Sequence, residues 1–85
     1  MDLTYPACFV RDRFRCRHCN NMNGIHKHHI VYRSHQGSDE LNNLLTLCHI
    51  CHRAHHDGKL KIEVLEVLED NLVVRFIRVG KWKPQ

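Results

Sequence analysis

The stretch that decides the fold is residues 16–56, CRHCNNMNGIHKHHIVYRSHQGSDELNNLLTLCHICHRAHH. Two Cys-x2-Cys pairs frame it, Cys16 with Cys19 and Cys48 with Cys51, and histidines fall between and after them. Two such knuckles supply four thiolates, the ligand set that a tetrahedral structural zinc ion prefers. A redox motif needs only one pair, so the spacing predicts structural zinc.

The length of the chain explains why a metal would be needed. At 85 residues it has the size of a single domain. Such a domain buries only about 60–65% of the surface that its unfolded chain exposes, so its core is thin. A structural zinc ion can contribute on the order of 10 kcal/mol of apparent binding free energy at neutral pH. We therefore expect one domain over residues 1–85, stabilised by zinc.

Three further residues near the knuckles have less distinctive interpretations. Cys8 lies outside both pairs in a mostly apolar stretch and is interpreted as a small buried hydrophobe. His18 and His49 lie inside the knuckles, where either could replace a cysteine as a ligand, but they are interpreted as exposed loop residues. Five cysteines are an odd number, which does not suit full disulfide pairing.

The first ten residues have no basic start, and no apolar run approaches the length of a membrane span. These features predict an intracellular, cytoplasmic protein without a signal peptide, a transmembrane segment or a membrane partner.

The charge is unevenly distributed along the chain. The formal net charge is +4, and acidic residues collect in the second half at Glu63, Glu66, Glu69 and Asp70. The basic residues expected to contact nucleic acid lie in the first half and are Arg11, Arg13, Arg15, Arg17, Lys27 and Arg33. A basic surface beside histidines would attract a polyanion through salt-dependent phosphate contacts. The alternative is a surface whose charges only keep the protein in solution.

Local patterns predict the order of the elements. Thr4 is a candidate N-cap for a short helix over residues 4–13. Residues 25–32 are expected to form a strand, residues 34–43 a polar loop and residues 44–47 a short buried stretch. A helix is expected over residues 49–56, closed by Gly58 in a left-handed cap.

The C-terminal part has branched apolar residues in two runs, over residues 60–68 and 72–79, about a turn with the sequence Glu69-Asp70-Asn71. Branched residues on both sides of an Asn-containing turn favour a β-hairpin over about residues 60–79. An amphipathic helix over residues 60–68 is the alternative.

Nine histidines in 85 residues are far more than is usual, and four of them form a pattern. His52 and His56 are four residues apart, so a helix would place them on one face, where they could hold a metal ion. His28 and His29 are adjacent on the expected strand and point to opposite faces unless the backbone bends. One of the two can then bind metal while the other faces a substrate.

Taken together, the motifs RCRHC, HHIVYRSHQGSDELNNLLTLC and HICHRAHH resemble the HNH endonuclease family, in its branch with two Cys-x2-Cys knuckles. The resemblance covers about residues 15–57. It implies a small α+β domain of the ββα-metal type, also called the HNH or His-Me finger, with a structural zinc ion. The expected C-terminal β-hairpin would be added to this core.

The resemblance also implies roles for individual residues. His29 corresponds to the catalytic histidine, the general base that activates a water molecule. Asn43, the other catalytic position, braces the finger and orients that base. His28, His52 and His56 correspond to the ligands of a catalytic divalent metal ion.

Two neighbours compete for these positions, and one ligand departs from the family pattern. Asn43 is preferred to Asn42 because it directly precedes leucine, and His56 is preferred to His55 because of its four-residue spacing. His28 stands where many members have an aspartate. A site of three imidazoles should bind Mn²⁺, Ni²⁺, Co²⁺ or Zn²⁺ well and Mg²⁺ more weakly.

The implied activity is metal-dependent hydrolysis of phosphodiester bonds in DNA, double-stranded DNA above all, by nicking or double-strand cleavage. The products would carry a 5′-phosphate and a 3′-hydroxyl, and the protein would act alone or within a larger phage or restriction machinery. Two alternatives stay open: a non-catalytic zinc-ribbon module that binds nucleic acid, and a structural or protein-interaction domain. Neither would require His29 and Asn43.

Overall fold

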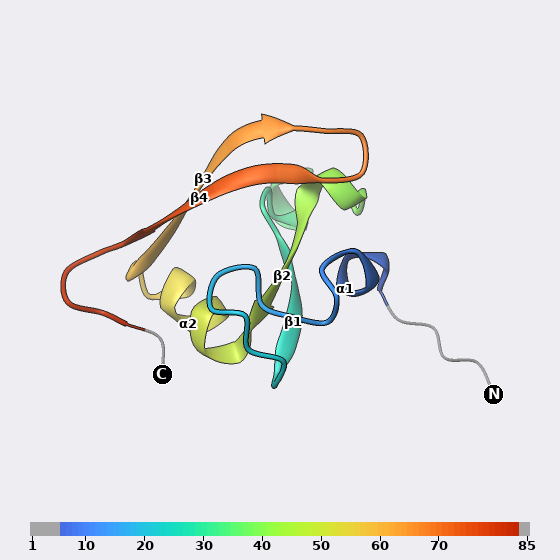
Figure 1. Ribbon diagram of the computed structural model, residues 1–85. Helices are drawn as coiled ribbons and strands as arrows, with labels where there is room; N and C mark the ends of the chain where they lie inside the picture. Colours follow the sequence, from blue (N-terminus) through green and yellow to red (C-terminus); the bar gives the residue numbers. More distant parts are fainter. Residues whose placement is uncertain (1–5, 84–85) are drawn as a thin grey trace.

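The computed structural model describes residues 6–83, apart from the side chain of Arg33. It is a small α+β structure with short helices and two small antiparallel sheets (Figure 1). The elements are α1 (Ala7–Arg11), β1 (Ile25–His29), η1 (Arg33–His35), η2 (Leu41–Asn43), β2 (Leu44–Cys48), α2 (His49–His56), β3 (Leu60–Val67) and β4 (Leu72–Arg78). None of the helices within residues 6–83 has the length and apolar character of a membrane span.

The centre of the fold is the unit β1–β2–α2. β1 and β2 pair antiparallel, with Ile25 opposite Cys48, and α2 begins directly after β2. Every residue of β2 is buried, as the apolar run in the sequence predicted. The Sγ atom of Cys48 accepts a hydrogen bond from the backbone N–H of Cys51 (3.4 Å) and so caps α2. The expected strand–strand–helix arrangement is confirmed.

A hairpin of β3 and β4 follows. It confirms the β-hairpin expected over about residues 60–79 and excludes the alternative, a helix over residues 60–68. A bulge interrupts the register between Val64 and Glu66. Leu60 and Leu72 are buried at the ends of the hairpin. Figure 1 shows the hairpin leaving α2 and arching across to the segment before β2. There, in η2, Asn42 Nδ2 donates to the carbonyl of Leu68 (3.1 Å).

A buried carboxylate joins the N-terminal part to the finger. The side chain of Asp12 is only 3% exposed. It accepts hydrogen bonds from the guanidinium groups of Arg11 (2.9 Å) and Arg17 (3.0 Å) and from the backbone N–H of Thr46 (3.2 Å). Burial acts to raise the pKa of Asp12, but the hydrogen bond and charge of Arg11, together with the charge of Arg17, outweigh it and lower this pKa.

The same two arginines hold the turn of the hairpin. Each guanidinium donates further hydrogen bonds to groups from distant parts of the chain. Their acceptors are the carbonyl oxygens of Leu41, Leu44 and Asp70 for Arg11, and Asn71 Oδ1 and the carbonyl oxygen of Leu72 for Arg17. Arg11 and Arg17 therefore connect α1 and the first knuckle with β2 and the hairpin.

Some boundaries differ from those expected. The first helix covers only Ala7–Arg11, because Arg13 and Phe14 adopt left-handed backbone conformations (φ 59° and 58°) that end it. The proposed cap, Thr4, lies outside the described residues. The expected strand over residues 25–32 stops at His29 because the side chain of Asn43, rather than a neighbouring strand, binds the backbone of Val31. Two short 3₁₀ helices, η1 and η2, interrupt the expected loop.

Candidate functional site

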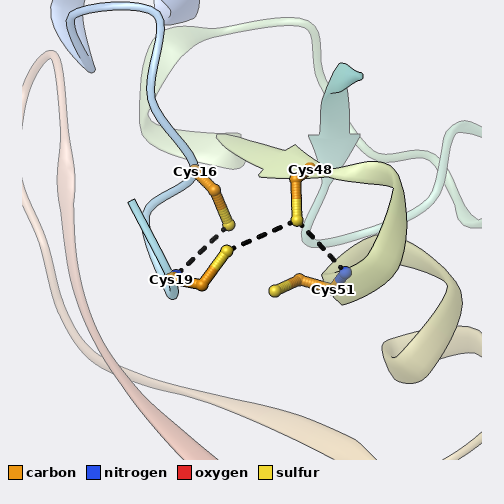
Figure 2. A group of neighbouring side chains, drawn as sticks. All are labelled: Cys16, Cys19, Cys48 and Cys51. Carbon is orange, nitrogen blue, oxygen red and sulfur yellow. Dashed lines mark hydrogen bonds between the residues drawn. The ribbon is translucent and has the colours of Figure 1, made fainter. Parts of the chain in front are cut away.

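The four knuckle cysteines converge on one point (Figure 2). Their sulfur atoms all lie within 4.8 Å of one another, and the Sγ atoms of Cys19 and Cys48 are 3.5 Å apart. Zinc–sulfur bonds of about 2.3 Å in a tetrahedron would place two sulfurs about 3.8 Å apart. In each knuckle, a backbone N–H donates to the sulfur of the first cysteine. The four cysteines could therefore bind a metal ion, and their geometry fits structural zinc.

The electrostatics of the thiols favour a cation at their centre. Burial acts to raise the pKa of Cys16, but backbone N–H groups, first that of Cys19, donate to its sulfur and lower this pKa. The pKa of Cys51 is raised, first by burial and then by the negative charge of Cys16. Deprotonation of Cys16 is thus favoured, whereas the negative charge of its thiolate opposes deprotonation of Cys51 beside it. A divalent cation removes this conflict because it pairs with all four thiolates.

His18 is not the exposed loop residue that was expected. It is partly buried, and its Nδ1 lies 3.3 Å from the Sγ of Cys51. Its ring stacks on Trp82 at a centroid distance of 5.9 Å and an interplanar angle of 26°. Burial, with a smaller effect from the charge of Arg78, lowers the pKa of His18. His49 is exposed as expected, but it begins α2.

A cavity of about 270 Å³ contains the histidines of the second group. It lies between β1 and α2 and is lined by Lys27, His28, His29, Tyr32, His52 and His56. The ring of His52 is 5.3 Å from that of His28 and 4.9 Å from that of His56, between centroids. In the described part of the chain, only the cysteine sulfurs meet as closely as 4.8 Å as a group. The three imidazoles thus face one cavity without the tight convergence of the thiols.

His28 has the buried nitrogen expected of a metal ligand. The residue is 2% exposed, and its Nε2 has no hydrogen-bond partner among the described residues. Burial, followed by the charges of His55, His52 and other nearby histidines, lowers the pKa of His28 to about 3. The ring is therefore neutral at physiological pH and keeps a lone pair for a ligand. A buried polar atom without a partner is costly, and a bound divalent ion would satisfy it.

His55, the competitor of His56, packs its ring 4.8 Å from that of His28, between centroids. Its Nδ1 donates to the carbonyl of Leu60 (2.9 Å), and the residue does not line the cavity. The cavity thus contains His56 and not His55.

His29 makes a hydrogen bond to a carboxylate that the sequence did not reveal. Its Nε2 lies 2.7 Å from Oδ1 of Asp39, and its side chain is 15% exposed. A carboxylate accepts, so Nε2 carries the proton of this hydrogen bond; in the neutral ring the lone pair is then on Nδ1. His28 and His29 line the same cavity rather than opposite faces, because His29 is the last residue of β1, where the strand geometry ends.

Asn43 fastens the segment that follows His29. Its Oδ1 accepts from the backbone N–H of Val31 (2.9 Å), and its Nδ2 donates to the carbonyl oxygens of Val31 (3.1 Å) and Ser38 (2.7 Å). These bonds hold both ends of the loop that contains η1. Asn42 instead binds the hairpin at Leu68.

The structure divides the six basic residues that were assigned to nucleic acid. Arg11 and Arg17 use their guanidinium groups within the protein, as described above, so they do not offer them to phosphate. Arg13 and Arg15 are exposed, and Lys27 lines the histidine cavity. The backbone of Arg33 begins η1, and its side chain lies outside the described part.

The chain matches the family model for HNH endonucleases over residues 16–58, about half of its length. The protein belongs to the HNH endonuclease family. Membership indicates a function connected with nucleases and nucleic acids. Anaredoxin from Nostoc sp. (strain PCC 7120 / SAG 25.82 / UTEX 2576) is 35% identical over 54 residues, which make up 62% of this chain and 71% of that protein. No solved structure matches the chain.

Sequence reasoning missed three residues at the histidine cavity. Tyr32 lines it and stacks on His56, at a centroid distance of 6.4 Å and an interplanar angle of 11°. His26 stacks on His52, and Asp39 contacts His29. His26 could have been found, since alternate residues of a strand share a face with His28. Tyr32 and Asp39 lie in irregular segments for which periodicity gives no signal.

Proposed function

We propose that this protein is a metal-dependent endonuclease that hydrolyses phosphodiester bonds in DNA. The observation that carries the proposal is the buried, unpartnered Nε2 of His28 in a cavity shared with His29, His52 and His56. Such an atom costs stability unless a ligand satisfies it, so it supports a bound metal ion in this cavity, which a module that only holds nucleic acid does not need.

His28, His52 and His56 would hold the catalytic ion. Three neutral imidazoles suit Mn²⁺, Co²⁺, Ni²⁺ or Zn²⁺ better than Mg²⁺. When bound, a divalent ion neutralises negative charge on the phosphate and the leaving oxygen. The four cysteines would hold a separate zinc ion that stabilises the finger.

His29 would act as the general base. With the proton on Nε2 and Asp39 as its acceptor, Nδ1 is free to take a proton from the attacking water. An imidazole is suited to this transfer near neutral pH. Asn43 would keep the base in place by holding the backbone two residues after it. Attack on phosphorus with departure of the 3′ oxygen leaves a 5′-phosphate and a 3′-hydroxyl.

Lys27 lies in the cavity wall and would contact the phosphate beside the reacting one. Arg13 and Arg15 are exposed and would bind the backbone further away. Each lost phosphate contact lowers the slope of log affinity against log salt by about 0.9 for duplex DNA. We therefore expect Arg13→Ala and Arg15→Ala to weaken binding and flatten its salt dependence.

Cleavage of supercoiled plasmid tests the proposal. The wild-type chain, loaded with zinc, is incubated with plasmid in Mn²⁺, Mg²⁺, Co²⁺, Ni²⁺ or additional Zn²⁺. We expect nicked or linear product with at least one ion, and a loss of about 10²–10⁴-fold in rate for His29→Ala. His35→Ala is the matched control, since this exposed histidine does not line the cavity.

Two results would contradict the proposal in different ways. Undiminished cleavage by His29→Ala would remove the assignment of the base. Plasmid binding without cleavage in every ion would instead support the alternative, a zinc-ribbon module that binds nucleic acid without cutting it.

A further inference from the structure

A second cavity, of about 260 Å³, shares no lining residue with the histidine cavity. Its polar wall consists of His49, Arg53 and Asp57 along α2 and its C-terminal end, together with Lys59. Trp82 closes it, and two apolar residues of α2 complete it. Lys59 and Trp82 lie beyond residues 16–58, so this cavity is partly built outside the family core.

The C-terminal segment is brought to α2 by backbone contacts. The N–H of Lys59 donates to the carbonyl of Ala54 (2.8 Å), and the N–H of Val79 donates to the carbonyl of Lys59 (2.9 Å). Gly80 then turns the chain with a φ of +67°. Trp82 returns to the edge of the core, where it stacks on His18 and packs against the buried cluster that includes Cys16, Cys48 and Cys51. The indole is thus fixed by the fold.

The chemistry of the wall suits a nucleotide. An indole offers a flat apolar surface for a base, and every base has a π-face that can stack on it. Two cations, Arg53 and Lys59, outnumber one carboxylate, Asp57. The contact between Arg53 and Asp57 is long (3.9 Å), and the side chain of Arg53 is 86% exposed, so this pair is weak. The guanidinium remains available to a phosphate.

The exposed face of α2 joins the two cavities. Residues three and four apart are neighbours on a helix surface. His52 and His56 line the histidine cavity, and His49 and Arg53, which lie three residues before them, line the second one. A helix is about 10 Å across. One strand of nucleic acid could therefore cross α2 and occupy both cavities.

We propose that the second cavity binds an unpaired base of single-stranded nucleic acid, which stacks on Trp82 while Arg53 and Lys59 hold the adjoining phosphates. This inference rests on the proposed function only in taking nucleic acid as the ligand. It does not require cleavage. It adds a preference for single-stranded segments, such as the end or an opened part of a duplex, beside the reacting phosphate.

Trp82 is the only tryptophan in the chain, so its fluorescence reports on the surroundings of this one indole, in the second cavity and beside His18. Zinc-loaded protein carrying His29→Ala is titrated with oligothymidylate, which stays intact if this histidine is the base and is checked on a gel. We expect saturable quenching of Trp82. Arg53→Gln with Lys59→Gln should weaken binding about fivefold or more, whereas Lys61→Gln with Arg75→Gln, an equal charge change on the hairpin, should have a much smaller effect.

An abasic strand of equal length and a blunt duplex separate stacking from charge attraction. Both should quench Trp82 far less than oligothymidylate. In labelled-oligonucleotide anisotropy, Trp82→Leu should lower the affinity at least about fivefold, because it removes the stacking surface for one base. Trp82→Phe should lower the affinity less, because phenylalanine keeps a smaller aromatic surface. Equal quenching by the abasic strand or the duplex would overturn the inference, as would unchanged affinity in the Arg53/Lys59 variant. None of these results depends on catalysis, so plasmid cleavage can fail while the inference stands.

Discussion

Replacing Asp12 by Asn should destabilise the fold far more than a surface substitution. The carboxylate is 3% exposed and accepts four hydrogen bonds: two from Arg11, one from Arg17 and one from the N–H of Thr46. Asn keeps the shape but removes the charge and puts an NH₂ group where an acceptor is needed. Breaking a buried ion pair costs about 3–5 kcal/mol. Because the arginines are 13% and 23% exposed, water compensates in part, and we expect about 2–4 kcal/mol.

Urea unfolding at a fixed free zinc concentration measures this loss as a lower midpoint at an unchanged slope. Asp57→Asn is the matched control, because its carboxylate is 49% exposed and 3.9 Å from Arg53. It should change the free energy of unfolding by less than about 0.5 kcal/mol. A loss within about 0.5 kcal/mol for Asp12→Asn would refute the role of this carboxylate as the connection between α1, β2 and the hairpin.

Three other predictions concern the structural zinc ion, the glycines and the buried histidine. Cys51→Ser should release the zinc ion and unfold the chain, measured by metal analysis and circular dichroism; a stable metal-free variant would contradict the structural role of zinc. Gly37→Ala should lower the free energy of unfolding in urea by about 3 kcal/mol, because the added Cβ would overlap the carbonyl of Val31. Gly58→Ala, which has open space around it, should lower it by only about 1 kcal/mol. The pKa of His28 is lowered to about 3, so below about pH 6.5 the unfolded chain binds a proton that the folded protein does not. The free energy of unfolding should therefore fall by up to about 1.4 kcal/mol per pH unit as the pH drops, and His28→Gln should flatten this pH dependence. An equal pH dependence in the two proteins would contradict the buried neutral ring.

The finger could be predicted from sequence because local signals agree there. The two knuckles, the apolar run of β2 and the four-residue spacing of His52 and His56 all point to strand, knuckle and helix in that order. The left-handed Gly58 closes α2 as expected. Branched residues on either side of a polar turn were sufficient to predict the hairpin.

The features of the fold and the site that could not be predicted from the sequence depend on contacts between residues far apart in the chain. Arg11 and Arg17 belong to a basic run that suggested a nucleic-acid surface, yet apart from Asp12 their partners lie 30 to 59 residues away. His18 becomes partly buried because Trp82 returns to it across the whole hairpin. Asp39 meets His29 only because the intervening loop folds back. Charge and spacing along the chain do not predict which distant residues come into contact.

Metal content measured site by site tests the central claim most directly, namely that the cysteines and histidines hold separate ions with separate tasks. Wild-type protein saturated with Co²⁺ should bind two ions, and His28→Gln with His52→Gln should keep one ion with a thiolate absorption band, stay folded and lose plasmid cleavage. If that variant bound two ions, or if it lost the thiolate-bound ion together with the other, the proposed division of tasks would be contradicted.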